Sequence, residues 1–146
     1  MLIFNFNENN APMNKQSMRE LFLKTRTIAV VGISSDPDKA SHYVPRYLQQ
    51  QGFRILPVNP RYPEVLGERC YASLRDIPIE VDMVNVFRRA GDCPSVAEQA
   101  VAIGAKSLWL QLGIASQAAQ EIASEAKLSV VMDACIMIEH ERLIDK

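Results

Sequence analysis

Short runs of apolar, largely β-branched residues alternate with amphipathic helical patterns along almost the whole chain. Unbroken apolar runs of this kind are typical of strands that are buried on both faces of a parallel sheet. Apolar residues at helical spacing between the runs predict helices that cover those faces. The alternation therefore predicts an α/β protein, a Rossmann-like three-layer α/β/α sandwich with a mainly parallel five-stranded sheet. The predicted strands are 27–33, 53–58, 81–87, 106–112 and 128–132.

The remaining segments divide into helices, one long connection and two ends of the chain. Helices are predicted over 14–24, from Ser41 to Gly52, from Asp92 or Ser95 to Gly104, and from Ser116 onward. Pro60 and Pro63 leave the connection up to Pro78 without a predicted helix or strand. We expect residues 1–13 to be a partly ordered tail and residues 14–146 to form one domain, with an apolar segment at 135–138 that packs back on the sheet.

The composition excludes several classes of protein. A formal net charge of −1 gives no broad attraction to nucleic acid or to an anionic membrane surface. No apolar run approaches the roughly 20 residues that span a bilayer. The three cysteines, Cys70, Cys93 and Cys135, show no metal-ligand spacing, so we expect no metal site. Small buried thiols in a reduced, cytoplasmic protein are the better interpretation.

The loop after the first predicted strand carries residues suited to a phosphate. In parallel α/β sheets, ligands bind beyond the carboxyl ends of the strands, at the switch point in strand order. Gly32 lets the backbone approach a ligand closely, and Ser34 and Ser41 add hydroxyl groups. Lys39 adds positive charge near a predicted helix N-terminus, which itself attracts anions. The alternative is an ordinary connection in which Ser41 caps the helix and Lys39 is solvated.

Two known phosphate motifs are absent, which narrows the class of nucleotide. The loop contains neither GxGxxG nor GxxxxGK[ST]. The second strand ends in Val58 and is followed by Asn59, Pro60 and Arg61, without the carboxylate that an NAD site places there. An arginine in its place favours a nucleotide with an extra ribose phosphate. Coenzyme A and NADP both carry one, so both remain possible ligands. The alternative is that the prolines only stiffen a turn.

The third and fourth strands also end in candidate binding residues. Arg88 can hold a phosphate by charge-assisted hydrogen bonds, and Phe87 can pack on an adenine or on a pantetheine arm. Gln111 interrupts an apolar strand, so its amide should meet backbone or ligand, and Gly113 again permits close approach. The alternative is a solvated arginine beside one core aromatic residue.

Five segments in a fixed order give the chain a resemblance to a known family. They are Val30–Ser34, Leu56–Pro60, Val81–Arg88, Leu108–Gly113 and Val130–Glu139. On these segments the chain resembles the CoA-binding domain family, typified by small bacterial YccU-like proteins. It also resembles, more distantly, the N-terminal CoA-binding domain of the succinyl-CoA synthetase α subunit.

The resemblance implies a role for each matching residue toward coenzyme A or acyl-CoA. Gly32, Ile33, Ser34, Lys39 and Ser41 would form the first phosphate-facing loop; Val58, Asn59 and Pro60 would border the adenosine; Phe87 and Arg88 would flank the cofactor; Gln111 and Gly113 would lie near the pantetheine path. The chain departs from the family at residues 36–41 of the first loop, where relatives often carry an arginine and a proline near the serine. Lys127 stands where glycine is common, and Ala134 where arginine is common.

No catalytic apparatus can be recognised in the sequence. The synthetase subunit uses a phosphorylated histidine in a second domain, which we do not expect here. His42 and His140 are expected at the surface, and Cys135 is expected to be an inert buried thiol. The sequence therefore favours a CoA-binding or acyl-CoA-binding module, a sensor or carrier without catalysis of its own and with no protein partner specified. The alternatives are an NADP-binding reductase-like protein and an interaction module that keeps the fold without the ligand.

Overall fold

The predicted sheet is present as five parallel strands in the order β2-β1-β5-β6-β7. The structure is a computed structural model that describes residues 5–144. The strands are β1 (Thr27–Val31), β2 (Arg54–Val58), β5 (Met83–Val86), β6 (Ser107–Leu110) and β7 (Ser129–Val131). Each lies within a predicted strand, and nearly every residue in them is buried, which confirms the fold class.

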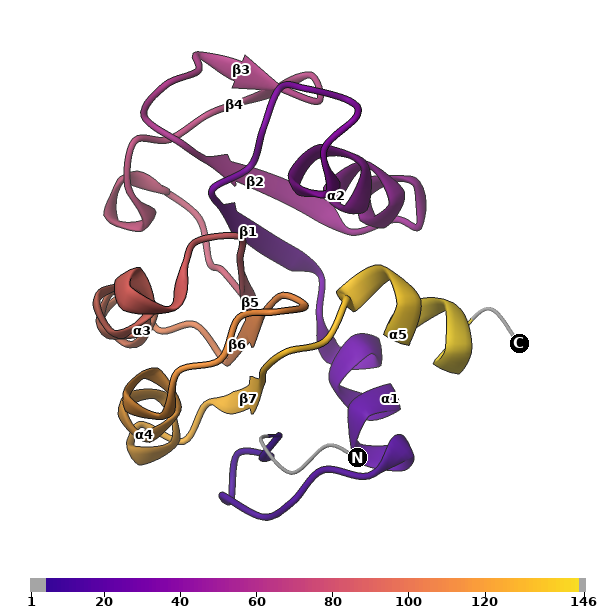
Figure 1. The fold of residues 1–146 in the computed structure, drawn as a ribbon, viewed down its shortest axis with the longest axis vertical. Helices are drawn as coiled ribbons and strands as arrows, with labels where there is room; N and C mark the ends of the chain where they lie inside the picture. Colours follow the sequence, from indigo (N-terminus) through magenta and orange to yellow (C-terminus); the bar gives the residue numbers. More distant parts are fainter. Residues whose placement is uncertain (1–4, 145–146) are drawn as a thin grey trace.

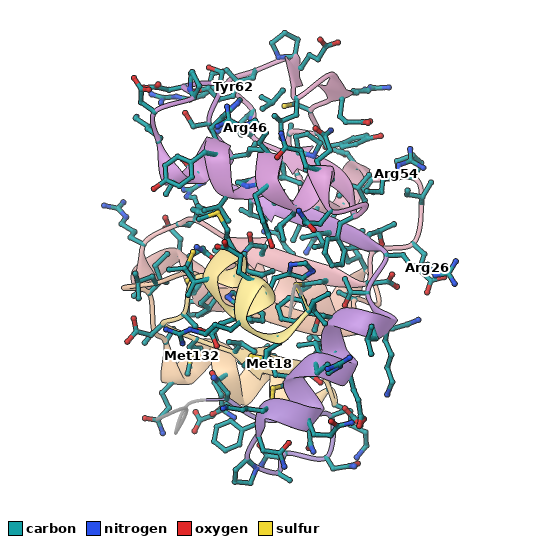
Figure 2. All side chains as sticks on the ribbon, turned by 90° about the vertical axis from the view of Figure 1, so that its right-hand side faces the viewer. Met18, Arg26, Arg46, Arg54, Tyr62 and Met132 are labelled. Carbon is teal, nitrogen blue, oxygen red and sulfur yellow. The ribbon has the colours of Figure 1, made fainter. Side chains whose placement is uncertain are left out.

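Helices cover both faces of the sheet (Figure 1). One face carries α1 (Lys15–Lys24), α2 (Ala40–Gln50) and α5 (Ile136–Leu143), and the other carries α3 (Cys93–Ala102) and α4 (Gln117–Glu125). Because successive strand residues point to opposite faces, side chains of the sheet contribute to two separate apolar cores, one on each face. Figure 2 looks onto the first of these faces, where α5 lies between α1 and α2. Within residues 5–144, no helix combines the length and apolar character that crossing a membrane requires.

Local sequence explains where several helices begin and end. Asn14 caps α1 in a capping box with Ser17, and Ser116 caps α4 by accepting from the backbone N–H of Ala119, as predicted for Ser116. Lys127 ends the turn after α4 with φ of 66°. This left-handed conformation explains why a glycine is suited to that position.

The long connection after β2 contains regular structure that the sequence did not predict. It forms a hairpin of β3 (Glu64–Val65) and β4 (Glu68–Arg69), followed by a 3-10 turn, η1 (Leu74–Asp76). Leu66 and Gly67 have φ of 57° and 75°, which suits a tight two-residue hairpin turn. Strands of two residues are too short to give a recognisable alternation of apolar and polar residues. A second 3-10 turn, η2 (Ala90–Asp92), precedes α3.

The two ends of the described chain pack against the sheet. Phe6 forms antiparallel bridges with Val130 and with Pro12, so part of the predicted tail lies along the β7 edge. The segment 135–138 packs back on the sheet as expected, but it belongs to a helix, α5, that continues to Leu143.

The expected surface position of His140 is wrong. The side chain is 3% exposed, with its Nδ1 atom 2.8 Å from the Tyr47 hydroxyl. The rings of Phe22 and Phe53 meet it edge to face. The error arises because α5 folds back over the sheet and buries its inner side. The expectation of buried thiols holds for Cys93 only, since Cys70 and Cys135 are partly exposed.

Candidate functional site

The strand order places a topological switch point between β1 and β5. From β1 the chain passes through α2 to β2 on one side, and it later returns to β5 on the other side. The loops after β1 and β5 therefore diverge toward opposite faces of the sheet, which opens a crevice at the carboxyl edge. This is the edge to which the sequence assigned the candidate residues.

Gly32 lies where the two loops meet. Its φ is 86°, and a Cβ atom at this position would lie 3.0 Å from the Phe87 carbonyl oxygen and 3.1 Å from Cδ of Arg88. The backbone N–H of Phe87 donates to the Val31 carbonyl at 2.8 Å, which fixes the second loop against the first. Only glycine combines this conformation with this close approach. Gly32, Phe87 and Arg88, predicted from separate segments, are thus brought together.

The loop after β2 is tied to the loop after β1. The Asn59 side-chain amide donates to the Ile33 carbonyl at 2.8 Å, so Asn59 positions the first loop. Tyr62 lies three residues after Asn59 in the same loop. Its hydrogen bonds with the side chains of Ser35 and Ser34 lower its pKa below the ordinary value for a tyrosine. Sequence reasoning missed Tyr62, because an aromatic residue between two prolines gives no signal of what it contacts.

The first loop is held in shape by its own polar groups. Ser34 is 7% exposed, and its hydroxyl accepts from the backbone N–H of Asp36 at 3.0 Å. Nδ1 of His42 donates to the Ser34 carbonyl at 2.7 Å, so His42 is half-buried rather than exposed. The side chain of Ile33 is fully buried, so only its backbone can face a ligand. Lys39 remains exposed at the start of α2.

Two helices that begin beside the switch point have no side-chain cap. Lys39 is the N-cap of α2 and Asp92 the N-cap of α3, and neither side chain accepts a hydrogen bond from its helix. The first N–H groups of a helix carry partial positive charge and need an acceptor. The 3-10 turn η2 runs directly into α3, so the Cys93 N–H already donates to the Ala90 carbonyl, and Pro94 has no N–H. The open end of α2 therefore suits an anion in the crevice better than the start of α3 does, and phosphate groups are typical ligands of such positions.

A cavity of about 300 Å³ lies at the carboxyl ends of β1 and β2, beside α3. It is lined by Val31, Val58, Pro60, Ala72, Ser73, Leu74, Arg88, Gly91, Asp92, Ser95, Val96 and Gln99. Val58, Pro60 and Arg88 were predicted site residues from two different segments, the end of β2 and the loop after β5. The polar pair Ser73 and Gln99, joined by a 3.3 Å hydrogen bond, was missed because the connection before η1 gave no structural signal. An apolar wall with a few polar groups suits a nucleoside.

Arg88 is oriented by a neighbouring carboxylate. Its Nη2 atom lies 3.1 Å from Oδ2 of Asp92, and Nε of the more exposed Arg89 lies 3.6 Å from the same oxygen. The two arginines leave an excess of positive charge around Asp92. Burial, and then the charge of Asp92, raise the pKa of the Cys93 thiol, while Arg88 opposes the shift.

Gln111 lies farther along the edge, in a small buried network of amides. Its Oε1 atom accepts from the backbone N–H of Ile136 at 2.9 Å and from Nδ2 of Asn85 at 3.4 Å. The Gln111 amide thus meets backbone, one of the two outcomes predicted for it. Gly113 donates its backbone N–H to Oδ1 of Asp133 at 2.7 Å. Within residues 5–144, Oδ1 of Asn85 is buried without a hydrogen-bond partner.

The structure therefore divides the predicted residues into groups along one edge. Val58, Pro60 and Arg88 line the cavity, and Gly32 and Phe87 meet beside it. Asn59, Ile33, Ser34 and Lys39 lie in the loops between this cavity and the start of α2, and Ser41 lies in the first turn of α2. Gln111 and Gly113 follow β6, which is separated from β1 by β5, so they do not line the cavity. A ligand that contacts all of them must be long.

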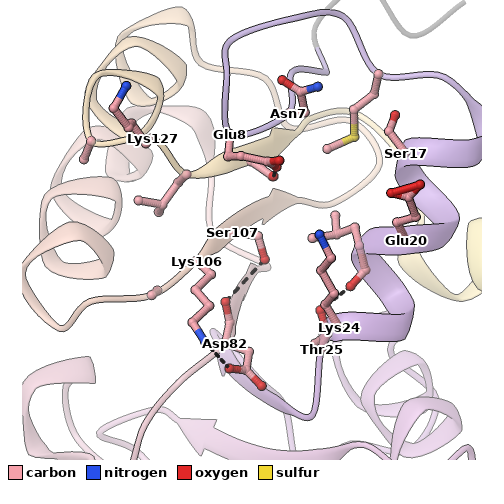
Figure 3. Close-up of a pocket in the computed structure, with 16 residues that line it drawn as sticks. Asn7, Glu8, Ser17, Glu20, Lys24, Thr25, Asp82, Lys106, Ser107 and Lys127 are labelled. Carbon is pink, nitrogen blue, oxygen red and sulfur yellow. Dashed lines mark hydrogen bonds and ion pairs between the residues drawn. The ribbon is translucent and has the colours of Figure 1, made fainter.

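A second cavity of about 520 Å³ lies at the opposite, amino end of the strands (Figure 3). Its charged lining mixes Lys24, Lys106 and Lys127 with Glu8, Glu20 and Asp82. Glu80 and then Asp82 hold the pKa of Lys106 above its ordinary value, so this ammonium group is already paired. The smaller cavity is the stronger candidate for a ligand site, because the amino end offers no switch point.

Comparison with known proteins gives a consistent result. The sequence pattern of the family described as CoA binding domain matches residues 26–141. The protein YneT of Bacillus subtilis is 39% identical over 127 residues, which cover 87% of this chain and 94% of YneT. The α subunit of ADP-forming acetate–CoA ligase II from Pyrococcus furiosus is 43% identical over 70 residues, 47% of this chain but only 15% of that subunit.

Solved structures share the fold over most of its length. A hypothetical protein from Pyrococcus horikoshii OT3 has a TM-score of 0.88 with 38% identity, over 90% of this chain and 93% of that one. The protein ID.343 from Thermus thermophilus has a TM-score of 0.87 with 42% identity, over 90% of this chain and 100% of that one.

Proposed function

This chain belongs to the CoA-binding domain family, as its motifs suggested, and from that premise we propose that it binds coenzyme A or acyl-CoA at the switch point. It acts as a binding module, a sensor or carrier without catalysis of its own. Its three free cysteines support the further proposal that it works in a reducing compartment, the cytoplasm.

One observation carries the proposal: the uncapped N-terminus of α2 flanks the crevice in which Gly32 meets Arg88. This arrangement provides backbone donors, close approach and positive charge for a diphosphate. The adenosine would occupy the cavity lined by Val58 and Pro60, with Ser73 and Gln99 as polar partners. The pantetheine arm would leave the crevice over β5 toward Gln111 and Gly113.

Arg88 is the residue that tests this placement most sharply. A charge-assisted hydrogen bond contributes about 1.5–3 kcal/mol, so Arg88→Ala should lower the affinity for coenzyme A roughly tenfold to a hundredfold. Because Arg88 would lie at the diphosphate, which both molecules share, the affinity for dephospho-CoA should fall by the same factor. Arg89→Ala is the matched control, since Arg89 pairs with the same carboxylate but does not line the cavity.

Isothermal titration calorimetry with coenzyme A, dephospho-CoA and NADP measures these affinities. We expect coenzyme A to bind and NADP to bind far more weakly. Equal losses in the Arg88 and Arg89 variants would remove Arg88 from the site. Preferential binding of NADP would favour a reductase-like protein, and no binding of any of the three nucleotides would favour an interaction module.

A further inference from the structure

The larger cavity, at the amino ends of the strands, has the construction of a second ligand site. Its volume of about 520 Å³ lies within the range of small-molecule pockets, about 300–1,000 Å³. Its floor is buried, since Ser107, Ser129, Met13 and Leu128 are each less than a tenth exposed. The lysines and glutamates of the lining are exposed and surround its mouth. The cavity thus combines a buried floor with a charged mouth.

Two serine hydroxyls on the floor have only weak hydrogen bonds. Ser107 and Ser129 begin β6 and β7 and pair with each other in the register of these strands. Oγ of Ser107 donates to the Asp82 carbonyl at 3.4 Å, and Oγ of Ser129 donates to Oε2 of Glu8 at 3.3 Å. Both bonds are long, because hydroxyl groups usually lie about 2.7–2.8 Å from the oxygen that accepts. A polar ligand on the floor would give both hydroxyls a stronger partner.

Side chains of both signs line the cavity without neutralising one another. Lys106 is paired with carboxylates outside the floor, but Lys24 forms no ion pair with any of the residues 5–144. This holds although Glu20 precedes Lys24 by one turn of α1, a spacing that favours pairing. Figure 3 shows the Lys24 side chain rising from α1 into the cavity, while Glu8 points into it from the segment before α1. The lining therefore presents a cation and an anion to the same space.

We propose that this cavity binds a free α-amino acid with an aliphatic side chain. The carboxylate of the ligand would bind the Lys24 ammonium group, and the ammonium group of the ligand would bind the Glu8 carboxylate. The aliphatic side chain would pack against Met13, Leu21 and Leu128.

The balance of charge is the reason for choosing a zwitterion. Three lysines and three acidic residues line the cavity, so its lining carries no net charge. A simple anion would meet the acidic side chains unpaired, and a simple cation would meet the lysines unpaired, whereas a zwitterion matches both signs. This site lies at the opposite end of the strands from the switch point, so the inference does not depend on the proposed function.

Calorimetry with L-leucine and two analogues of the same hydrocarbon skeleton tests the inference on the whole chain. Isocaproate lacks only the amino group, and isoamylamine lacks only the carboxylate. We expect leucine to bind, and each analogue to bind at least about tenfold more weakly, because each loses a charge-assisted hydrogen bond. In labelled protein, leucine should shift the amide resonances of Ser107 and Ser129 most.

Two exposed side chains provide variants that leave the buried floor intact. Lys24→Gln should lower the affinity for leucine about tenfold and abolish its advantage over isoamylamine. Glu8→Gln should lower it by a similar factor and abolish the advantage over isocaproate. Lys15→Gln is the matched control, because Lys15 is an exposed lysine of the same helix that does not line the cavity.

The outcomes are distinct from those for coenzyme A. No binding of leucine at roughly 10 mM would overturn the inference, and so would equal affinities for leucine and isocaproate. Resonance changes confined to the carboxyl edge, or equal losses in the Lys24 and Lys15 variants, would overturn it as well. Each of these results leaves the proposed CoA site standing, and failure of coenzyme A to bind leaves the amino-acid site standing.

Discussion

Replacing Gly32 with alanine tests whether the two loops at the switch point must touch. Alanine at a φ of 86° costs about 1–2 kcal/mol in backbone strain. Its methyl group would also lie 3.0 Å from the Phe87 carbonyl oxygen and 3.1 Å from Cδ of Arg88. The arginine side chain can move, but the backbone carbonyl is fixed by β5, so crowding should add roughly 1–3 kcal/mol.

Gly104→Ala separates the two contributions. Gly104 has a similar φ of 76°, but a Cβ atom there would meet nothing within 4 Å. We therefore expect this control to lose only the stability that the backbone strain costs, about 1–2 kcal/mol. Urea unfolding of both variants and the parent gives the free energies of unfolding.

The two variants should also differ in binding. Gly32→Ala should displace Arg88 and Phe87 and so lower the affinity for coenzyme A. Gly104→Ala, at the end of α3, should leave that affinity unchanged. Equal losses of stability in the two variants, with unchanged binding in Gly32→Ala, would refute the claim that the loops meet at Gly32.

Two further predictions concern groups near the same edge. Gln111→Leu removes the acceptor of the Ile136 N–H and should lower the free energy of unfolding by about 1–3 kcal/mol; an unchanged urea midpoint would contradict the network. Burial, and then Asp92, raise the pKa of Cys93, so the folded state keeps the thiol proton to higher pH than the unfolded state. Stability should therefore fall as pH rises above about 8.5, and Cys93→Ala should show a shallower fall in urea titrations at several pH values. An identical slope in parent and variant would be evidence against this role.

The fold was predictable because its strands are buried on both faces. Val30 and Val84 are fully buried, so their strands had to be apolar, and such runs are visible in sequence. The hairpin at 64–69 was not predictable, since its strands contain two residues each. The buried position of His140 depends on how α5 returns over the sheet, and no local pattern encodes that contact.

The candidate residues could be assigned to loops from the sequence, but their contacts could not be predicted. Gly32, Arg88 and Asn59 were selected as candidates because they follow strands, and the fold brings such positions to one edge. The pairing of Arg88 with Asp92, and the cavity residues Ser73 and Gln99, come from the relative placement of α3 and the long connection. That placement is set by tertiary packing, which sequence spacing does not record.

The central claim is that coenzyme A binds at the carboxyl edge, at the switch point between β1 and β5. Titration of isotopically labelled protein with coenzyme A, followed by amide chemical shifts, measures this residue by residue. The account predicts that the largest changes occur at the backbone amides of Gly32, Ser34 and Arg88. Changes confined to Glu20, Lys106 and Ser129, around the cavity at the amino ends of the strands, would contradict it.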